Sequence, residues 1–305
     1  MADSIQGTLF QPPERDPALR VGPAGWSYED WEDIVYPAGS GRSFDGLAFL
    51  ADYFDTVEIN SSFYSPPGPN AAASWARRVR HNPRFKFTAK AWQRVSHERK
   101  EDEGDLAADC ELVRASMEPL AEAGLLGALL MQFPWSFRCT PQAMDYLARL
   151  FRLLAGLPLV VEVRHGSWER QEFLAFLREH RVGFCNLDQP VIGNSMKPTA
   201  HVTSRVGYFR LHGRNYRDWF REGAGRDARY DYLYTKEEIG RLARLIRTVR
   251  QGAEETYAIT NNHFRGQALV NAIEILEELD AHPPAVPPRL AEAYPRLKRP
   301  QIAAD

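Results

Sequence analysis

The sequence predicts an α/β protein that folds as one (β/α)8 TIM-type barrel. Short β-like runs alternate with helical patterns along the chain, which is typical of parallel strands joined by right-handed crossovers. The alternation extends over residues 20–280, close to the ~250 residues that this fold usually needs. The first loop, GPAGWSYEDW, lacks the G-x-G-x-x-G fingerprint that a doubly wound open sheet often carries at that place.

The predicted strands are short runs of β-branched, aromatic and other apolar residues, bounded by turn or helix signals. In chain order they occupy residues 20–26, 56–60, 85–90, 128–133, 159–164, 183–187, 207–212 and 256–262. Eight such strands are the number that closes a TIM-type barrel.

Helical patterns follow every strand except the sixth, and Asn70 is suited to cap the second helix. The predicted helices occupy residues 46–54, 70–80, 105–124, 141–156, 170–181, 236–250 and 266–279. The link between the sixth and seventh strands, residues 188–205, carries Pro190, Gly193 and Pro198, so we expect an irregular loop there.

The barrel is predicted to be the single domain, over residues 20–280. Residues 1–19 form an N-terminal extension, and residues 281–305 form a Pro-rich tail that we expect to be extended. The N-terminus lacks a basic start followed by an apolar core, and no apolar run approaches the ~18 residues of a membrane span. We therefore expect a cytoplasmic protein.

Charge and cysteine content exclude several classes of protein. The net charge of -2 and the pI near 6.5 give no overall attraction to nucleic acid or to anionic membranes, so neither is an expected partner. Cys110, Cys139 and Cys185 are far apart and form no C-x-x-C pair, which argues against a disulfide framework or a zinc knuckle. The sequence predicts no particular oligomeric state.

Alternation along the strands divides apolar from polar side chains. In strand 159–164, Val161 and Val163 share one face, whereas Glu162 and Arg164 share the other. We assign the apolar face to the surrounding helices and the polar face to the barrel axis. The polar residues then lie at the C-terminal mouth of the barrel, where active sites of this fold are found.

The other strands show the same alternation. In the sixth strand it sets Cys185 and Leu187 against Asn186 and Asp188, which assigns Asn186 and Asp188 to the axis. The polar residues expected at the mouth are Glu58, Glu162, Asp188, Lys90, Arg164, Arg210, His212, Asn60, Gln132, Asn261 and Asn262, with Trp26, Tyr64 and Trp168 on the adjoining loops.

These residues predict an enzyme that binds a small anionic ligand, bearing phosphate or carboxylate and including sugar-like molecules. Arg164, Arg210 and Lys90 would hold the anion. The catalytic candidates are the carboxylates Glu58, Glu162 and Asp188 together with His212, and acid–base hydrolysis or isomerisation is the favoured chemistry. The amides of Asn60, Gln132, Asn261 and Asn262 would orient hydroxyl groups.

Other interpretations remain open. The three carboxylates and three cations could form only a balanced ion network, because buried charges must be paired. No cofactor is expected in the main hypothesis, but Glu162, Asp188 and His212 could hold a divalent metal in an isomerase or hydrolase. A third alternative is a non-catalytic module that binds nucleic acid or protein through residues 213–234, which mix arginines with aromatic residues.

Several motifs resemble the domain-of-unknown-function-72 family, also called YecE-like. They span most of the chain in the expected order. The matching stretches are GPAGWSYEDW, YFDTVEINSSFYSPP, FKFTAKAWQRVSH, LLMQFPWSF, VVEVRHGSW, YFRLHG and the double asparagine at 261–262. The resemblance implies a TIM-type barrel and no established activity or substrate. Thr260 departs from the aromatic residue that often precedes the double asparagine.

Overall fold

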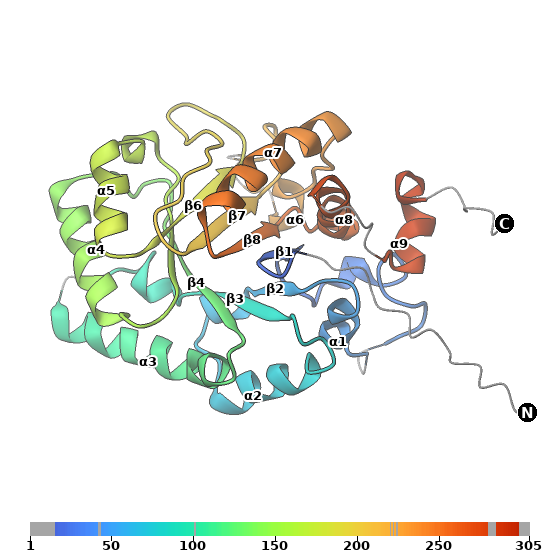
Figure 1. The fold of residues 1–305 in the computed structure, drawn as a ribbon, viewed down its shortest axis with the longest axis horizontal. Helices are drawn as coiled ribbons and strands as arrows, with labels where there is room; N and C mark the ends of the chain where they lie inside the picture. The colour runs from blue at the N-terminus through green and yellow to red at the C-terminus, as the bar shows by residue number, and fades with distance from the viewer. Residues whose placement is uncertain are drawn as a thin grey trace, which may run out of the picture.

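The computed structural model describes residues 16–41, 44–100, 102–219, 221, 223, 225–279 and 285–298. The strands are β1 (Leu19–Pro23), β2 (Thr56–Ile59), β3 (Lys86–Lys90), β4 (Leu126–Gln132), β5 (Leu159–Glu162), β6 (Gly183–Asp188), β7 (Val206–Leu211) and β8 (Glu255–Thr260). They form one parallel eight-stranded sheet in the order β1-β8-β7-β6-β5-β4-β3-β2, with helices around it (Figure 1). The predicted (β/α)8 barrel is confirmed.

The helices follow the strands in the predicted order, each within a few residues of its predicted ends. They are α1 (Gly46–Ala51), α2 (Pro69–Arg78), α3 (Glu103–Glu122), α4 (Pro141–Leu153), α5 (Gln171–Glu179), α6 (Arg226–Arg229), α7 (Lys236–Gly252), α8 (Gln267–Leu279) and α9 (Pro288–Ala293). The sequence did not predict the short helices α6 and α9. None of the described helices is both long and apolar enough to cross a membrane.

The barrel closes between β1 and β2 through a single bridge. Ala24 pairs with Glu58, and the amide of Gly25 donates a hydrogen bond to the Glu58 carbonyl at 2.9 Å. The two strands approach closely at Gly22, where a Cβ atom would lie only 2.0 Å from the carbonyl oxygen of Thr56. A side chain at this position would push the strands apart, so closure depends on this glycine.

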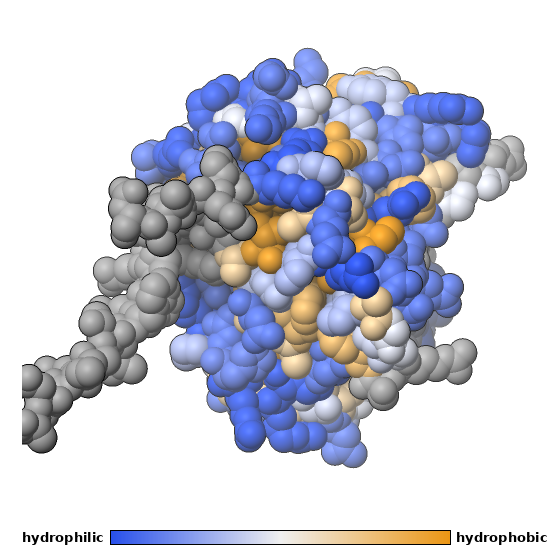
Figure 2. Space-filling model, turned by 90° about the vertical axis from the view of Figure 1, so that its right-hand side faces the viewer, coloured by the Kyte–Doolittle hydropathy of each residue, from blue (hydrophilic) through white to orange (hydrophobic). Residues whose placement is uncertain are grey.

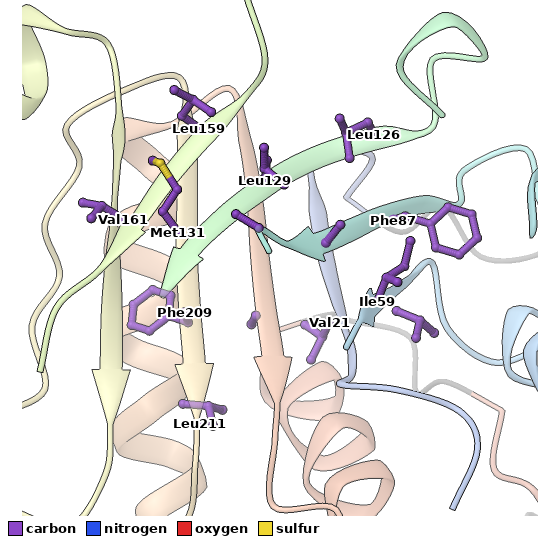
Figure 3. Close-up of a cluster of buried hydrophobic side chains, with 14 of the residues drawn as sticks. Val21, Ile59, Phe87, Leu126, Leu129, Met131, Leu159, Val161, Phe209 and Leu211 are labelled. Atoms are coloured by element: carbon purple, nitrogen blue, oxygen red, sulfur yellow. The ribbon is translucent and has the colours of Figure 1, made fainter. Parts of the chain in front are cut away.

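Apolar side chains form two layers, one on each face of the sheet. The outer layer packs under the helices and includes Val21, Ile59, Phe87, Met131 and Phe209, all buried (Figure 3). The inner layer fills the barrel and consists of Ala24, Ala128, Leu130, Val160, Cys185, Leu187, Val206, Tyr208, Tyr257 and Ile259. The predicted assignment of polar and apolar faces is therefore correct for β2, β3, β5 and β7.

The assignment of β6 was wrong. Cys185 and Leu187 point into the barrel, so Asn186 and Asp188 point outward. The link between β6 and β7 has no helix, as predicted, and its backbone lies over this outer face. The Asn186 amide donates to the carbonyls of His201 and Tyr208, and its oxygen accepts from the His201 amide at 2.8 Å. A polar outer residue is needed because an irregular loop brings backbone groups that require partners.

The C-terminal residues contain α9, which begins with proline at its first turn, a position where proline favours a helix. Leu290 and Leu297 are buried, and Arg296 pairs with Glu274 of α8 at 2.6 Å. This side of the molecule is mostly hydrophilic, with separate apolar patches between polar side chains (Figure 2). Residues 1–15 of the predicted N-terminal extension, and residues 281–284 and 299–305 of the predicted tail, lie outside the described residues.

Candidate active site at the barrel mouth

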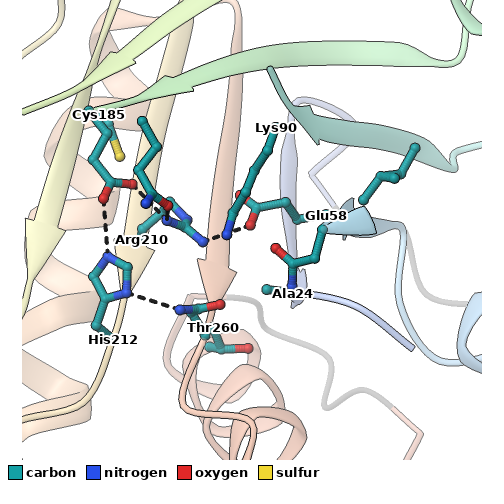
Figure 4. Close-up of polar contacts among 12 residues, drawn as sticks. Ala24, Glu58, Lys90, Cys185, Arg210, His212 and Thr260 are labelled. Carbon is teal, nitrogen blue, oxygen red and sulfur yellow. Dashed lines mark hydrogen bonds and ion pairs between the residues drawn. The ribbon is translucent and has the colours of Figure 1, made fainter. Parts of the chain in front are cut away.

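A guanidinium group lies at the centre of the polar cluster above the apolar barrel interior. Arg210 of β7 is fully buried and contacts two carboxylates that are also fully buried. It donates to Glu58 of β2 at 2.7 Å, to Glu162 of β5 at 2.7 Å and to the side-chain oxygen of Gln132 at 2.8 Å (Figure 4). Tyr208 supplies a second donor to Glu58, at 3.0 Å. One cation thus links β7 to β2, β4 and β5 across the barrel.

The Glu162 carboxylate is paired twice. Its second oxygen accepts from the Nη2 atom of Arg164 at 2.6 Å. Burial alone would raise the pKa of Glu162, but the adjacent Arg210 and Arg164 guanidiniums and His212 outweigh burial and hold the pKa well below its usual range. Glu162 is therefore a carboxylate at neutral pH and has no proton to donate.

His212 follows β7 and is neutral. Burial lowers its pKa to about 3, and the nearby Arg164 and Arg210 act in the same direction against the Glu162 carboxylate. Asn261 donates to its Nδ1 atom at 3.0 Å, so the ring proton lies on Nε2, 3.6 Å from Glu162 (Figure 4). The imidazole therefore joins the end of β8 to the ion network.

A cavity of about 690 Å³ opens above this network at the C-terminal mouth of the barrel. The residues that line it are Gly25, Trp26, Ser27, Tyr28, Asn60, Ser61, Phe63, Tyr64, Lys90, Gln93, His97, Gln132, Arg229, Tyr230, Asn261 and His263. Among these described lining residues are Lys90, Arg229 and the two histidines His97 and His263, but no aspartate or glutamate. Its volume suits a small molecule.

Lys90 ends β3 and points into this part of the barrel (Figure 4). Burial lowers the pKa of its ammonium to about 7, and Arg210 acts in the same direction, whereas Glu58 and Glu162 oppose the shift. The Nζ atom lies 5.6 Å from the centre of the Phe63 ring. Within the described part of the chain, no carboxylate forms an ion pair with Lys90.

His97 lines the same cavity beside Lys90. Burial lowers its pKa to about 4, with a further contribution from Arg164. Its Nδ1 atom lies 3.0 Å from the Ser96 hydroxyl, and its ring packs edge-on against Phe63. The side chain is therefore a neutral imidazole at pH 7, held in place by two contacts and able to accept a proton.

Most of the predicted site residues meet at the mouth. Glu58, Glu162, Arg164, Arg210 and His212 form the ion network. A second group lines the cavity above that network: Trp26, Asn60, Tyr64, Lys90, Gln132 and Asn261.

Three predicted residues lie elsewhere. Asp188 points outward and accepts hydrogen bonds from Arg214 at 2.6 Å and from Tyr234 at 2.6 Å. Asn262 faces α8, where its amide donates to Asn271 at 2.8 Å. Trp168 is fully buried in the outer apolar layer, and its indole donates to the Phe137 carbonyl. Asp188, the last residue of β6, and Asn262, two residues beyond β8, have outward parity. Trp168 is the last residue of a short 3-10 turn, Gly166–Trp168, and is buried in the core.

The structure does not bring together the three residues of the alternative metal site. The Glu162 carboxylate is already paired with two guanidiniums. Asp188 points to the outer face of the sheet, where it pairs with Arg214, whereas His212 contacts Glu162 inside the barrel. The three side chains therefore do not converge on one point. Over the described ranges, no group of three or more histidine, cysteine, aspartate or glutamate side chains is arranged to hold a metal ion.

Sequence reasoning missed several residues of the cavity wall. Tyr28, Phe63, Gln93, Arg229 and Tyr230 were not predicted as site residues. Tyr28 stacks on His263 with ring centres 4.5 Å apart, and Tyr230 lies 5.3 Å from the same ring. All five are loop or short-helix residues, where strand parity gives no information. The many aromatic residues in these loops were the feature of the sequence that could have indicated a cavity wall.

Comparisons with known proteins agree with this architecture. The sequence model described as "Protein of unknown function DUF72" matches residues 20–296. The UPF0759 protein YunF of Bacillus subtilis is 26% identical over 287 residues, covering 90% of this chain and 100% of YunF. The crystal structure of a DUF72 family protein from Thermotoga maritima is 34% identical with a TM-score of 0.73, covering 86% of this chain and 98% of that one. A DUF72 family structure from Enterococcus faecalis is 28% identical with a TM-score of 0.75, covering 87% and 96%.

Proposed function

The chain belongs to the DUF72 family of TIM-type barrel proteins, and from this premise we propose that it is an enzyme acting on a small anionic, hydroxylated molecule bound at the barrel mouth. The observation that carries the proposal is the charge of the cavity wall. Lys90 and Arg229 line it, and the described lining holds no carboxylate. A concave site with one sign of charge concentrates ligands of the opposite sign.

The ion network below the cavity does not neutralise the positive charge of Lys90. Glu58 and Glu162 carry two negative charges, and Arg210 and Arg164 carry two positive charges, so the network below the cavity is neutral. Protonated Lys90 is then an excess cation. An anion bound beside it would take the place of the missing carboxylate partner, which is how a buried cation is normally satisfied.

Amides and aromatic rings favour a ligand with hydroxyl groups. Asn60, Gln132 and Asn261 come from three different strand ends and line the same cavity. The Oδ1 atom of Asn60 is buried without a hydrogen-bond partner, so it is an acceptor for a ligand hydroxyl. Trp26 and Tyr230 add flat apolar surfaces of the kind on which sugar rings can stack.

We propose that Glu58, Glu162 and His212 do not exchange protons with the ligand, because none of the three lines the cavity. The carboxylates lie behind Gln132, where we propose that they fix Arg210 and Arg164 and do not transfer protons themselves. His97 and Lys90 line the cavity directly, with pKa values of about 4 and about 7. Proton transfer to or from a bound ligand is therefore assigned to these two residues.

The test is a thermal-shift screen of the full chain against sulfate, inorganic phosphate, sugar phosphates and small hydroxy acids. A ligand at 100 times its dissociation constant adds ~2.7 kcal/mol of stability, which is readily detected. Arg229→Gln and Lys90→Met should each weaken the response. Arg241→Gln and Lys236→Met, which change exposed cations on α7, are the matched controls and should leave it unchanged. An equal loss in the controls, or no response to any anion, would contradict the proposal.

A further inference from the structure

Lys90 differs from other lysines of the chain in its surroundings. Its amine lies at the cavity wall over Phe63, and the carboxylates that act on it, Glu58 and Glu162, are already held by Arg210 and Arg164. Lys86, on the same strand at the opposite end of the barrel, instead pairs with Glu255 at 2.5 Å. A structural lysine at a barrel mouth would be expected to have such a partner.

These surroundings favour the neutral amine. Removal from water disfavours the ammonium, and the positive charges of Arg210 and Arg164 disfavour it further, so the pKa falls to about 7. About half of the Lys90 side chains are then unprotonated at neutral pH, against roughly one in three thousand for a lysine of ordinary pKa. A desolvated lysine next to other cations is a known route to an amine nucleophile.

We propose that Lys90 is the catalytic nucleophile of this site and forms an imine with the carbonyl group of a small anionic aldehyde or ketone. The inference rests on the proposed function, which it deepens by naming the substrate class: keto acids, and sugar phosphates in their open-chain form. Arg229, which also lines the cavity, holds the anionic group, and the carbonyl carbon lies at Nζ.

The reaction needs no oxidant or further reactant. The Nζ lone pair forms a bond to the carbonyl carbon, and the π electrons of the C=O bond move to oxygen, which takes up a proton. The nitrogen loses a proton to give the carbinolamine. The C–O bond then breaks, the hydroxyl leaves with a proton as water, the C=N bond forms, and the nitrogen loses its remaining proton. One amine and one carbonyl yield one imine and one water.

His97 is placed to carry the protons of these steps. It lines the cavity with Lys90, its imidazole is neutral, and its Nδ1 atom is already engaged by the Ser96 hydroxyl. The Nε2 atom therefore remains for the carbinolamine. Proton transfer by a positioned imidazole typically contributes ~100-fold or more to such a step.

The experiment traps the imine by reduction. The full chain is incubated at pH 7 with pyruvate or dihydroxyacetone phosphate and cyanoborohydride, and the modified lysines are located by peptide mass spectrometry. We expect Lys90 to acquire the adduct at least about tenfold faster than the paired Lys86 or the exposed Lys236, because its neutral fraction is far larger. In wild-type protein the labelling rate should reach half its maximum near pH 7. Lys90→Met should lose the adduct.

The outcomes separate this inference from the function on which it rests. The imine proposal is wrong if Lys90 is labelled no faster than Lys86 and Lys236, or if its labelling rate reaches half its maximum near pH 10. Thermal stabilisation by sulfate would then still support the anion site. If sulfate also has no effect, the proposed function fails as well. The wild-type pH profile decides the question even if Lys90→Met does not fold.

Discussion

At the residue scale, the buried ion network is the most demanding feature of the molecule. Arg210, Glu58 and Glu162 are removed from water completely, and their charges are balanced by one another, by Arg164 and by a few neutral donors and acceptors. Such a cluster tolerates the loss of a member poorly, because the remaining charge stays buried without a partner. The network therefore fixes the floor of the cavity.

Glu162→Gln tests this account. Arg210 and Arg164 would lose their shared carboxylate, and we expect the free energy of unfolding to fall by about 3–5 kcal/mol, the usual cost of breaking a buried pair. Denaturant unfolding at pH 7 measures it. Glu103→Gln is the matched control, because the Glu103–Arg152 pair is exposed and such pairs contribute at most about 1 kcal/mol. Equal costs for the two variants would contradict the network.

The pH dependence of stability has a definite sign. The pKa of Glu162 is lower in the folded chain than in the unfolded chain, so the unfolded state binds more protons as the pH falls. The stabilisation is present above the ordinary glutamate pKa and is lost as the pH falls toward the folded value. Wild-type protein should therefore lose more stability than Glu162→Gln between about pH 5 and pH 3.

At the scale of elements, β6 differs from the other strands because no helix follows it before the next strand. Its outer face carries Asn186, which binds the link that replaces the helix, and Asp188, which binds Arg214 and Tyr234 from the connection after β7. Alternation in the sequence identified the two faces of this strand but could not tell which one faced inward. The barrel accepts Cys185 and Leu187 inside because the neighbouring interior residues are also apolar.

Asn186→Ala should release the link between β6 and β7. Its side chain makes two donor and two acceptor hydrogen bonds, including one from the Thr199 hydroxyl at 2.7 Å. At about 1 kcal/mol for each bond, we expect a loss of roughly 2–4 kcal/mol. Hydrogen exchange should quicken most at the His201 amide. Thr199→Val removes a single bond and should cost much less. Unchanged exchange at His201 would show that the link is held by other contacts.

At the scale of the whole molecule, the sequence predicted the features that follow from the number of strands and from the alternation of side chains along them. Eight strands with helical connections fixed the barrel, and parity placed Glu58, Lys90, Glu162 and Arg210 at one end. What it could not predict depends on packing between distant segments. Arg229 reaches the cavity from a long connection after β7, and its position follows from tertiary contacts rather than from a repeating pattern. The pairing of Arg210 with two carboxylates likewise requires the closed barrel.

The titration of Lys90 should control how the whole site binds anions. Lys90 is charged below a pH of about 7 and neutral above it, so the affinity for an anion is greatest on the acid side and decreases as the pH rises. Sulfate is the appropriate probe, because its charge does not change over this range. Loss of one charged hydrogen bond corresponds to about a tenfold weaker affinity between pH 6 and pH 9.

Calorimetry in buffers of different ionisation enthalpy measures both the affinity and the proton uptake. A bound anion favours the ammonium, so sulfate binding near pH 7 should take up a fraction of a proton in wild-type protein. Lys90→Met should bind sulfate more weakly, through Arg229, with neither pH dependence nor proton uptake in this range. Lys236→Met should behave as the wild type. A pH-dependent affinity that persists in Lys90→Met would assign the titrating group elsewhere, and His263 or His97 in the cavity wall would be the next residues to replace.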